Sequence, residues 1–213
     1  MKFVTNESFR KTSNAVVKNV RLARYKHVSL QGSIVHIEFM RDKSRDMPII
    51  ENRLEITSMT IWHCNYLSFS QLSKCTNLEQ LNVATLPEGD FNFLLKCNSL
   101  KFLSITHLPN ISNLDSLSGL LELETLSLST LPSWDAWGKK TFVHTLEPLA
   151  KLPKLKFLEL FGVLPEAVSL ESLSIFQHLE SARFSKYPKK ILNQFYKQFE
   201  VSDNCAPEFE IAS

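Results

Sequence analysis

The stretches LEQLNVATL, residues 78–86, and LKFLSITHL, residues 100–108, carry the same apolar pattern 22 residues apart. In both, the apolar positions follow L-x-x-L-x-L, while the polar positions between them change freely. Clear copies of this pattern begin at residues 78, 100, 123 and 155, and degenerate copies at 34, 56 and 179. The spacings are therefore 22, 22, 22, 23, 32 and 24 residues. Self-similarity at such a period indicates coils that stack on one another and share a core.

Each copy contains two periodicities that predict local structure. The alternating pair at the end of the pattern, such as Leu81 with Val83, suits a short strand with one buried face. Upstream, apolar residues recur every third position, as in Phe69, Leu72 and Cys75, which suits short 3₁₀ or irregular helical turns. The same run returns in four further copies: Phe91, Leu94, Cys97; Leu114, Leu117, Leu120; Leu146, Leu149, Leu152; and Leu170, Leu173, Phe176.

This recurring pattern resembles the leucine-rich repeat, and the 22-residue spacing is most similar to the bacterial, internalin-like class. The resemblance covers residues 34–187. It implies an α/β fold, a leucine-rich-repeat solenoid with about seven repeats, a curved parallel sheet on the concave face and a 3₁₀ or irregular convex side. The family usually places Asn three residues after the last strand Leu. Here the corresponding residues are Cys64, Leu86, Leu108, Leu131, Val163 and Tyr187, so apolar packing is expected to close the turns.

Both ends of a solenoid need caps, because the outermost coils would otherwise leave the core open to water. Residues 188–213 are expected to form a C-terminal cap and tail. Within them Ile191, Leu192, Phe195, Tyr196 and Phe199 have helical spacing and predict a capping helix. Residues 1–33 are expected to form an N-terminal cap or a degenerate repeat. Val17, Val20 and Leu22 fit either an eighth, shortened copy or one face of a helix.

The concave sheet is the predicted binding surface, because strand residues that alternate with the buried pair point onto it. Four aromatic residues would stand there on a floor of mostly Ser and Thr: Trp62, Phe102, Phe157 and Phe161. Polar residues of the same face are expected to fix the register of a partner: His36, Glu38, Asn82, Glu159 and Arg183. Exposed aromatics among small polar residues are typical of protein-binding surfaces. Alternatively, the N-terminal segment covers one or two of them, or the register differs.

The spacing of 32 residues places an insertion, PSWDAWGKKTFVHT, at residues 132–145. Insertions in solenoids form loops on one rim and frequently carry binding residues. Trp134 and Trp137, together with Lys139 and Lys140, make this segment a second candidate contact with a partner. An alternative is that one Trp packs back onto the convex side as a lid.

Composition and charge make several functional classes of protein less favoured. Lys and Arg number 24 against 22 Asp and Glu, a net charge of +2, far from the basic excess usual in nucleic-acid binders. The opening residues lack the apolar region of a signal peptide, and no window approaches the length of a membrane helix, so a cytoplasmic protein is expected. The four cysteines form no C-x-x-C pair, and Cys75 and Cys97 are expected as buried thiols in the core.

The sequence contains no phosphate-binding loop, no nucleophile elbow and no H-E-x-x-H motif. We therefore expect a non-catalytic module without cofactor, metal or small-molecule substrate, which binds a protein partner through the concave sheet and the 132–145 loop. The resemblance implies, more specifically, a cytoplasmic bacterial immunity protein that neutralises a toxin by occlusion. Two alternatives stay open: an adaptor or effector that recruits a host or signalling protein, and a binder of nucleic acid or anionic surfaces that uses the basic N-terminus.

Overall fold

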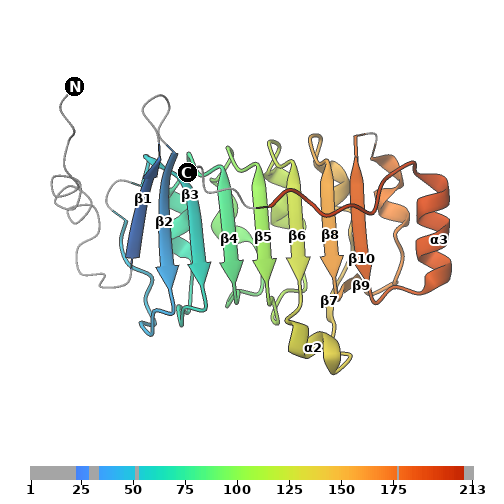
Figure 1. The fold of residues 1–213 in the computed structure, drawn as a ribbon, viewed down its shortest axis with the longest axis horizontal. Coiled ribbons are helices and arrows are strands. Elements are labelled where there is room, and N and C mark those ends of the chain that lie inside the picture. Colours follow the sequence, from blue (N-terminus) through green and yellow to red (C-terminus); the bar gives the residue numbers. More distant parts are fainter. Residues whose placement is uncertain (1–22, 29–33, 51–52, 177, 209–213) are drawn as a thin grey trace.

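A long parallel sheet forms one side of the molecule, in the computed structural model that describes residues 23–28, 34–50, 53–176 and 178–208 (Figure 1). Within the described residues, seven parallel strands correspond one for one to the seven predicted copies. They are β2 Ile34–Met40, β3 Ile56–Trp62, β4 Gln80–Ala84, β5 Phe102–Thr106, β6 Thr125–Ser129, β8 Phe157–Phe161 and β10 Ser181–Ser185. The strands follow this order across the sheet, so each coil contacts its neighbours in sequence. The predicted leucine-rich-repeat solenoid is confirmed.

The core is a set of columns that run through the stacked coils. In the register of the strands, Leu81 lies beside Leu103, Leu103 beside Leu126, and Leu126 beside Leu158. These four side chains are at most 1% exposed. No single coil encloses them, since each leucine is covered by the coils on both sides. The repeated apolar positions therefore build one continuous core rather than seven small ones.

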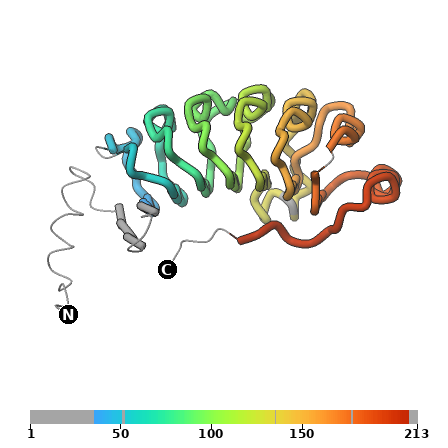
Figure 2. Tube along the Cα trace, turned by 90° about the horizontal axis from the view of Figure 1, so that it is seen from above, coloured from blue at the N-terminus to red at the C-terminus, as the bar shows by residue number. Residues whose placement is uncertain are grey.

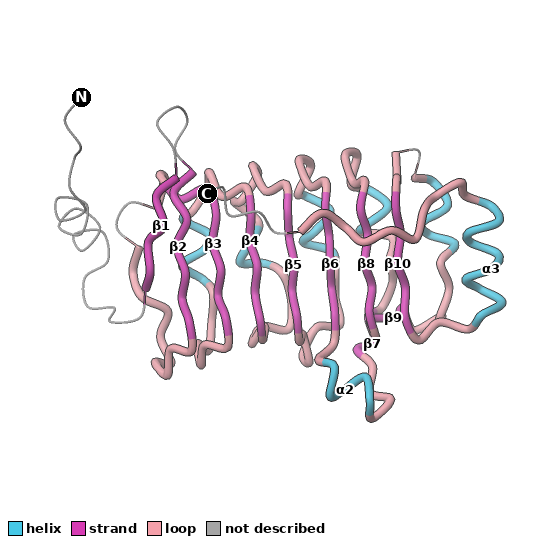
Figure 3. The backbone as a smooth tube through the Cα atoms, viewed as in Figure 1, coloured by secondary structure: helices cyan, strands magenta, loops and turns pink. Residues whose placement is uncertain are grey.

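Short 3₁₀ helices line the side opposite the sheet (Figure 3). They are η1 Ser70–Lys74, η2 Asn92–Leu94, η3 Asp115–Gly119, η4 Leu149–Lys151 and η5 Glu171–Ile175. The period of three in the sequence reflects their hydrogen bonding: the Leu72 N–H donates to the Phe69 carbonyl, and the Cys75 N–H to the Leu72 carbonyl. Cys75 and Cys97 are fully buried, and burial raises the pKa of these thiols to about 11 and about 12. They pack as small apolar side chains.

Main-chain hydrogen bonds close the turns that follow the strands, where the related repeats carry an Asn. In five coils the N–H of the residue after the strand donates to the carbonyl of the last strand residue of the next coil, for example His63 to Ala84 at 3.3 Å, Thr85 to Thr106 at 2.7 Å and His107 to Ser129 at 2.7 Å. After β8, the Gly162 N–H donates instead to Ser185 Oγ at 2.8 Å. Packing contributes at the predicted closure positions, because Leu86 and Leu108 are fully buried. The expected apolar packing is therefore present, and main-chain hydrogen bonds close the turns together with it.

The residue after the strand adopts a left-handed backbone in six of the seven described coils. It is Arg41, His63, Thr85, His107, Gly162 or Lys186, with φ between 52° and 76°. Side chains other than glycine disfavour this conformation. The cross-coil bond does not by itself impose this conformation, because Thr130 donates its N–H to the Phe161 carbonyl at 2.8 Å without a positive φ.

Replacing Gly162 by Ala should lower the free energy of unfolding by about 2 kcal/mol, because the new methyl group would overlap the Thr130 side chain at a φ of +70°. Urea denaturation followed by circular dichroism measures this change. Thr130→Ala in the same chain should recover about half of the loss. Gly119→Ala is the control, since no atom lies within 4 Å of the added carbon. An equal loss in both glycine variants would contradict the steric explanation.

The first part of the insertion projects from the solenoid, and its last part forms an additional strand that packs on the core. Helix α2, Pro132–Ala136, projects from the rim at which the strands end (Figure 1). The chain then returns as β7, Thr141–Val143, which pairs in parallel with β9, Val163–Pro165, in a second sheet. Thr141 and Val143 are buried. The loop predicted for residues 132–145 is therefore shorter than expected, because its last part contributes to the core.

The ends of the sheet differ. Strand β1, Ala23–Val28, pairs antiparallel with β2, and the rest of the predicted N-terminal unit, residues 1–33, including Val17, Val20 and Leu22, lies outside the described residues. At the other end, the predicted capping helix is confirmed as α3, Lys189–Gln198. Phe195 of this helix lies 5.1 Å from the ring of Phe184 and is 3% exposed.

Candidate functional site

The side chains of the inner strand face form three rows across the coils, as the register of the pairs shows. The central row is Glu38, Thr60, Asn82, Ser104, Ser127, Glu159 and Arg183. We call the face formed by these rows the concave face; it is the inner side of the arc in Figure 2. The predicted residues on it share one surface, but most are half-buried rather than freely exposed.

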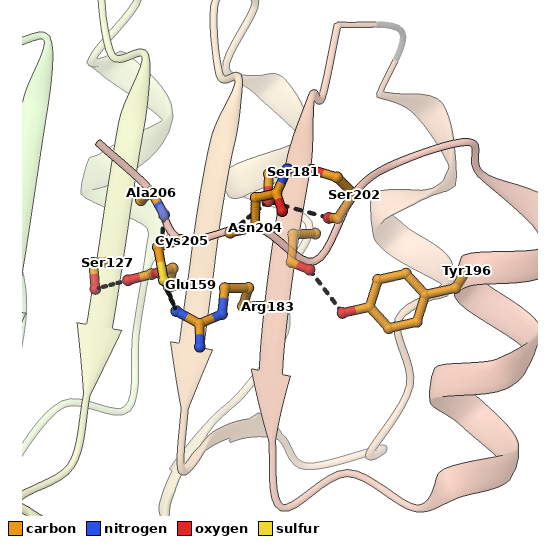
Figure 4. Close-up of polar contacts among 10 residues, drawn as sticks. Ser127, Glu159, Ser181, Arg183, Tyr196, Ser202, Asn204, Cys205 and Ala206 are labelled. Atoms are coloured by element: carbon orange, nitrogen blue, oxygen red, sulfur yellow. Dashed lines mark hydrogen bonds and ion pairs between the residues drawn. The ribbon is translucent and has the colours of Figure 1, made fainter. Parts of the chain in front are cut away.

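The C-terminal segment Val201–Glu208, which we call the tail, crosses the concave face (Figures 2 and 4). It leaves α3 and forms a parallel bridge at the edge of β10, between Ser202 and Ser181. The Ala182 N–H donates to the Ser202 carbonyl at 3.0 Å, and the Ser202 N–H donates to the Glu180 carbonyl at 3.1 Å. The tail then turns across β10 and β8 toward the middle of the sheet.

Glu159 is the centre of the polar contacts on this face (Figure 4). Its carboxylate accepts hydrogen bonds from Ser127 Oγ at 2.8 Å, from Arg183 Nη1 at 3.2 Å and from the Ala206 N–H at 3.2 Å. The Glu159 side chain is only 13% exposed. A cation and two neutral donors therefore compensate the carboxylate at this partly buried position.

Arg183 and Ser181 provide the other contacts with the tail. Arg183 Nη1 lies 3.1 Å from Cys205 Sγ, and its guanidinium lies 5.1 Å from the centre of the Phe161 ring. Ser181 Oγ faces two tail carbonyls, those of Asn204 at 2.7 Å and Ser202 at 3.1 Å. The site therefore recognises main-chain groups more than side chains.

A groove of about 450 Å³ opens where the described tail ends. Predicted residues Trp62, Asn82, Phe102 and Glu159 line it, together with floor residues Ser104, Thr106 and Ser127 and with the tail from Cys205 to Glu208. A second hollow of about 410 Å³ includes Phe161 and Pro132, next to α2. Phe157 lies beside Thr125 and Ser181 in the row nearest the strand starts and lines neither space. Trp62, Phe102 and Phe161 are therefore divided between two neighbouring hollows, and Phe157 lies outside both.

The expectation that His36 is available to a partner is wrong for this structure. The residue lies in the predicted row, but its ring is fully buried. Its Nδ1 is 2.8 Å from Ser58 Oγ, and its Nε2 is 3.7 Å from a carboxylate oxygen of Glu38. Ser58 is also fully buried and continues the polar contacts to Gln80. His36 is thus buried within the sheet and cannot contact a partner, whereas the Glu38 side chain is 16% exposed.

The two tryptophans of the insertion have different surroundings. The ring of Trp134 packs edge to face on His107, 4.8 Å between centres, and Lys139 Nζ lies 5.2 Å from its centre. Burial and, to a smaller extent, His63 lower the pKa of His107, which favours the neutral ring in this contact. Trp137, in contrast, is 83% exposed. One Trp therefore packs back, as the alternative held, but onto the rim; the other is available for binding.

Sequence reasoning missed the tail and the serine that holds it. The tail residues show neither periodicity nor a motif, and Ser181 was only one of many small residues on the floor. Among the described residues, no group of three or more His, Cys, Asp or Glu side chains could hold a metal ion. No helix in the same part of the chain has the length and apolar character needed to cross a membrane.

Comparison with known proteins identifies the fold. No protein-family model matches the sequence, and no curated protein matches it either. Among solved structures, the chain is similar to internalin InlF from Listeria monocytogenes, with a TM-score of 0.55 and 18% identity over 70% of this chain and 40% of the internalin. It is also similar to internalin C2 (InlC2) of that bacterium, with a TM-score of 0.53 and 16% identity over 70% of this chain and 60% of the other.

These likenesses define the class: the chain folds as a leucine-rich-repeat solenoid. Within that class, both of these solved structures are internalins, the proteins that the 22-residue spacing resembles. The chain spans about half of the length of these two proteins, and at such identities the similarity carries the fold alone.

Proposed function

We propose that this protein is a non-catalytic protein-binding module whose concave face and α2 loop receive a protein partner. The observation that carries the proposal is the groove in which Trp62 and Phe102 flank a floor of Asn82 and serines. Aromatic side chains set among small polar groups supply most of the binding energy in many protein interfaces. Trp137, on the neighbouring rim, offers a further large apolar contact.

The proposed mechanism is steric. A partner would bury the aromatic residues, use the polar neighbours to fix its register, and have its own working surface covered or held. The near-neutral charge of +2 favours a protein over a nucleic acid as the partner. The proposal includes a cytoplasmic location and needs no cofactor, metal or small-molecule substrate.

Within this class we propose an immunity protein that neutralises a toxin by occlusion. The support is an analogy with small proteins that resemble bacterial leucine-rich repeats, so the proposal rests on fold and surface together. An adaptor that recruits a host or signalling protein would use the same surface. Expression of the captured partner with and without this chain distinguishes the immunity role from the adaptor role. The immunity role requires that the partner alone arrests growth and that co-expression of this chain restores growth.

Affinity capture followed by mass spectrometry tests the binding surface. The full chain is compared with Trp62→Ala/Phe102→Ala, in which each truncation should remove an aromatic side chain of the groove and the two together should lower partner affinity by tenfold or more. The matched control is Leu121→Ala/Ile175→Ala, which removes two exposed apolar side chains away from the concave face. Thermal melting verifies that both variants fold. Capture of the same partners by all three chains would contradict the proposed surface.

A further inference from the structure

The tail lies on the proposed binding surface, and of its residues Val201 alone is among the apolar side chains packed against the core. From Ser202 to Glu208 each side chain is exposed or half-exposed. By contrast, Phe195 in the preceding helix is 3% exposed. A segment with polar contacts and little buried apolar surface opens at a lower free energy than the core that supports it. The tail can therefore leave while the solenoid stays folded.

The contacts that hold the tail are those that an extended peptide would make. Ser181 Oγ faces the carbonyls of Ser202 and Asn204, and the Glu159 carboxylate accepts the Ala206 N–H. Every extended polypeptide offers such carbonyl and N–H groups. Where the tail passes Arg183, the guanidinium is already paired with Glu159, so a small neutral residue, here Cys205, suits this position.

We propose that Ser181, Glu159 and Arg183 form a docking site for an extended polypeptide segment, that the tail occupies this site within the same chain, and that a partner segment binds by displacing it. This inference rests on the proposed function and specifies its regulation. The partner segment presents two carbonyls to Ser181, an N–H to Glu159 and a small neutral residue beside Arg183. The groove beyond, with Trp62 and Phe102, then receives its continuation.

The tail can compete with a partner segment for the docking site because it is covalently attached to the same chain. A short flexible connection gives an effective concentration in the millimolar range. A few main-chain hydrogen bonds give a free peptide a Kd on the order of 10⁻⁴ M. The site would then be occupied in about nine of ten molecules, and the tail would weaken partner binding roughly tenfold.

The main experiment keeps the full chain and releases the tail by one substitution. Ala206→Pro removes the N–H that Glu159 accepts, but leaves Ser181, Glu159 and Arg183 in place. A fluorescent peptide with the sequence of residues 201–213, VSDNCAPEFEIAS, is the probe in an anisotropy titration. It should bind the Ala206→Pro chain about tenfold more tightly than the natural chain. Glu208→Pro, which changes an exposed tail residue outside these hydrogen bonds, is the matched control and should behave like the natural chain.

Two results of the titration would overturn the inference: equal affinity of the peptide for the natural and Ala206→Pro chains, or undiminished binding of a peptide that itself carries Ala206→Pro. Hydrogen exchange gives a second readout in the absence of any peptide. Glu159→Gln should speed deuterium uptake by the tail severalfold, whereas Glu79→Gln, in an exposed ion pair with Lys101, should not. Unchanged uptake in Glu159→Gln would also overturn it. None of these measurements uses a partner, so their failure leaves the capture experiment as an independent test of the proposed function.

Discussion

Replacing Leu103 by Ala should lower the free energy of unfolding by about 3 kcal/mol. The side chain is fully buried, between Leu81 of the preceding coil and Leu126 of the next. Its loss would leave a cavity in the middle of the shared core, where the main chain of three paired strands prevents collapse. Urea denaturation followed by circular dichroism measures the effect.

Leu121→Ala is the matched control for this prediction. It makes the same chemical change at a side chain that is 54% exposed, so we expect a loss below about 1 kcal/mol. The double variant Leu81→Ala/Leu103→Ala should depart from the sum of the single effects, because the two leucines are buried side by side on paired strands. Similar losses of unfolding free energy in Leu103→Ala and Leu121→Ala would contradict the placement of Leu103 in the buried leucine column of the core.

Replacing Phe195 by Ala should lower the free energy of unfolding by about 3 kcal/mol, and the damage should begin at the last coil. The ring is 3% exposed and lies 5.1 Å from Phe184 and 5.0 Å from Phe199. Without it, α3 would lose its anchor and expose the terminal coil. Hydrogen exchange should therefore rise first in β10, before the strands in the middle of the sheet.

Tyr196→Phe separates the packing of the helix from its polar contact. Tyr196 donates a hydrogen bond to the Ala182 carbonyl at 2.7 Å, and removing this hydroxyl should cost about 1 kcal/mol. If Phe195→Ala accelerated exchange uniformly along the sheet, α3 would not be a local cap, and the role assigned to it would be wrong.

The strands, the core and the cap could be predicted because each rests on a repeated pattern. Leu81, Leu103, Leu126 and Leu158 occupy one column, as their equal places in the copies required. The 3₁₀ turns follow from the period of three. These features depend on local geometry and on burial, both of which leave a periodic trace in the sequence.

Other features left no such trace. The bond between Ala206 and Glu159 joins residues 47 positions apart through a main-chain N–H, which every residue but proline carries. His36 shares its row with Ser58, Thr125 and Ser181, which are buried as well, and no pattern in the sequence marks this burial. The left-handed turns were equally hidden, because five of the six residues that adopt them are not glycine. The site residues on the concave face, for these reasons, were predicted in position but not in accessibility.

The closure of the turns by main-chain bonds has a consequence for divergence among relatives of this protein. A stacked amide side chain must be retained in every coil, whereas an N–H is present whatever the side chain. His63, Thr85 and His107 donate only their N–H groups across the coils. The rim beside the concave face can therefore accumulate substitutions without loss of fold, and new specificities could evolve there while the scaffold remains unchanged.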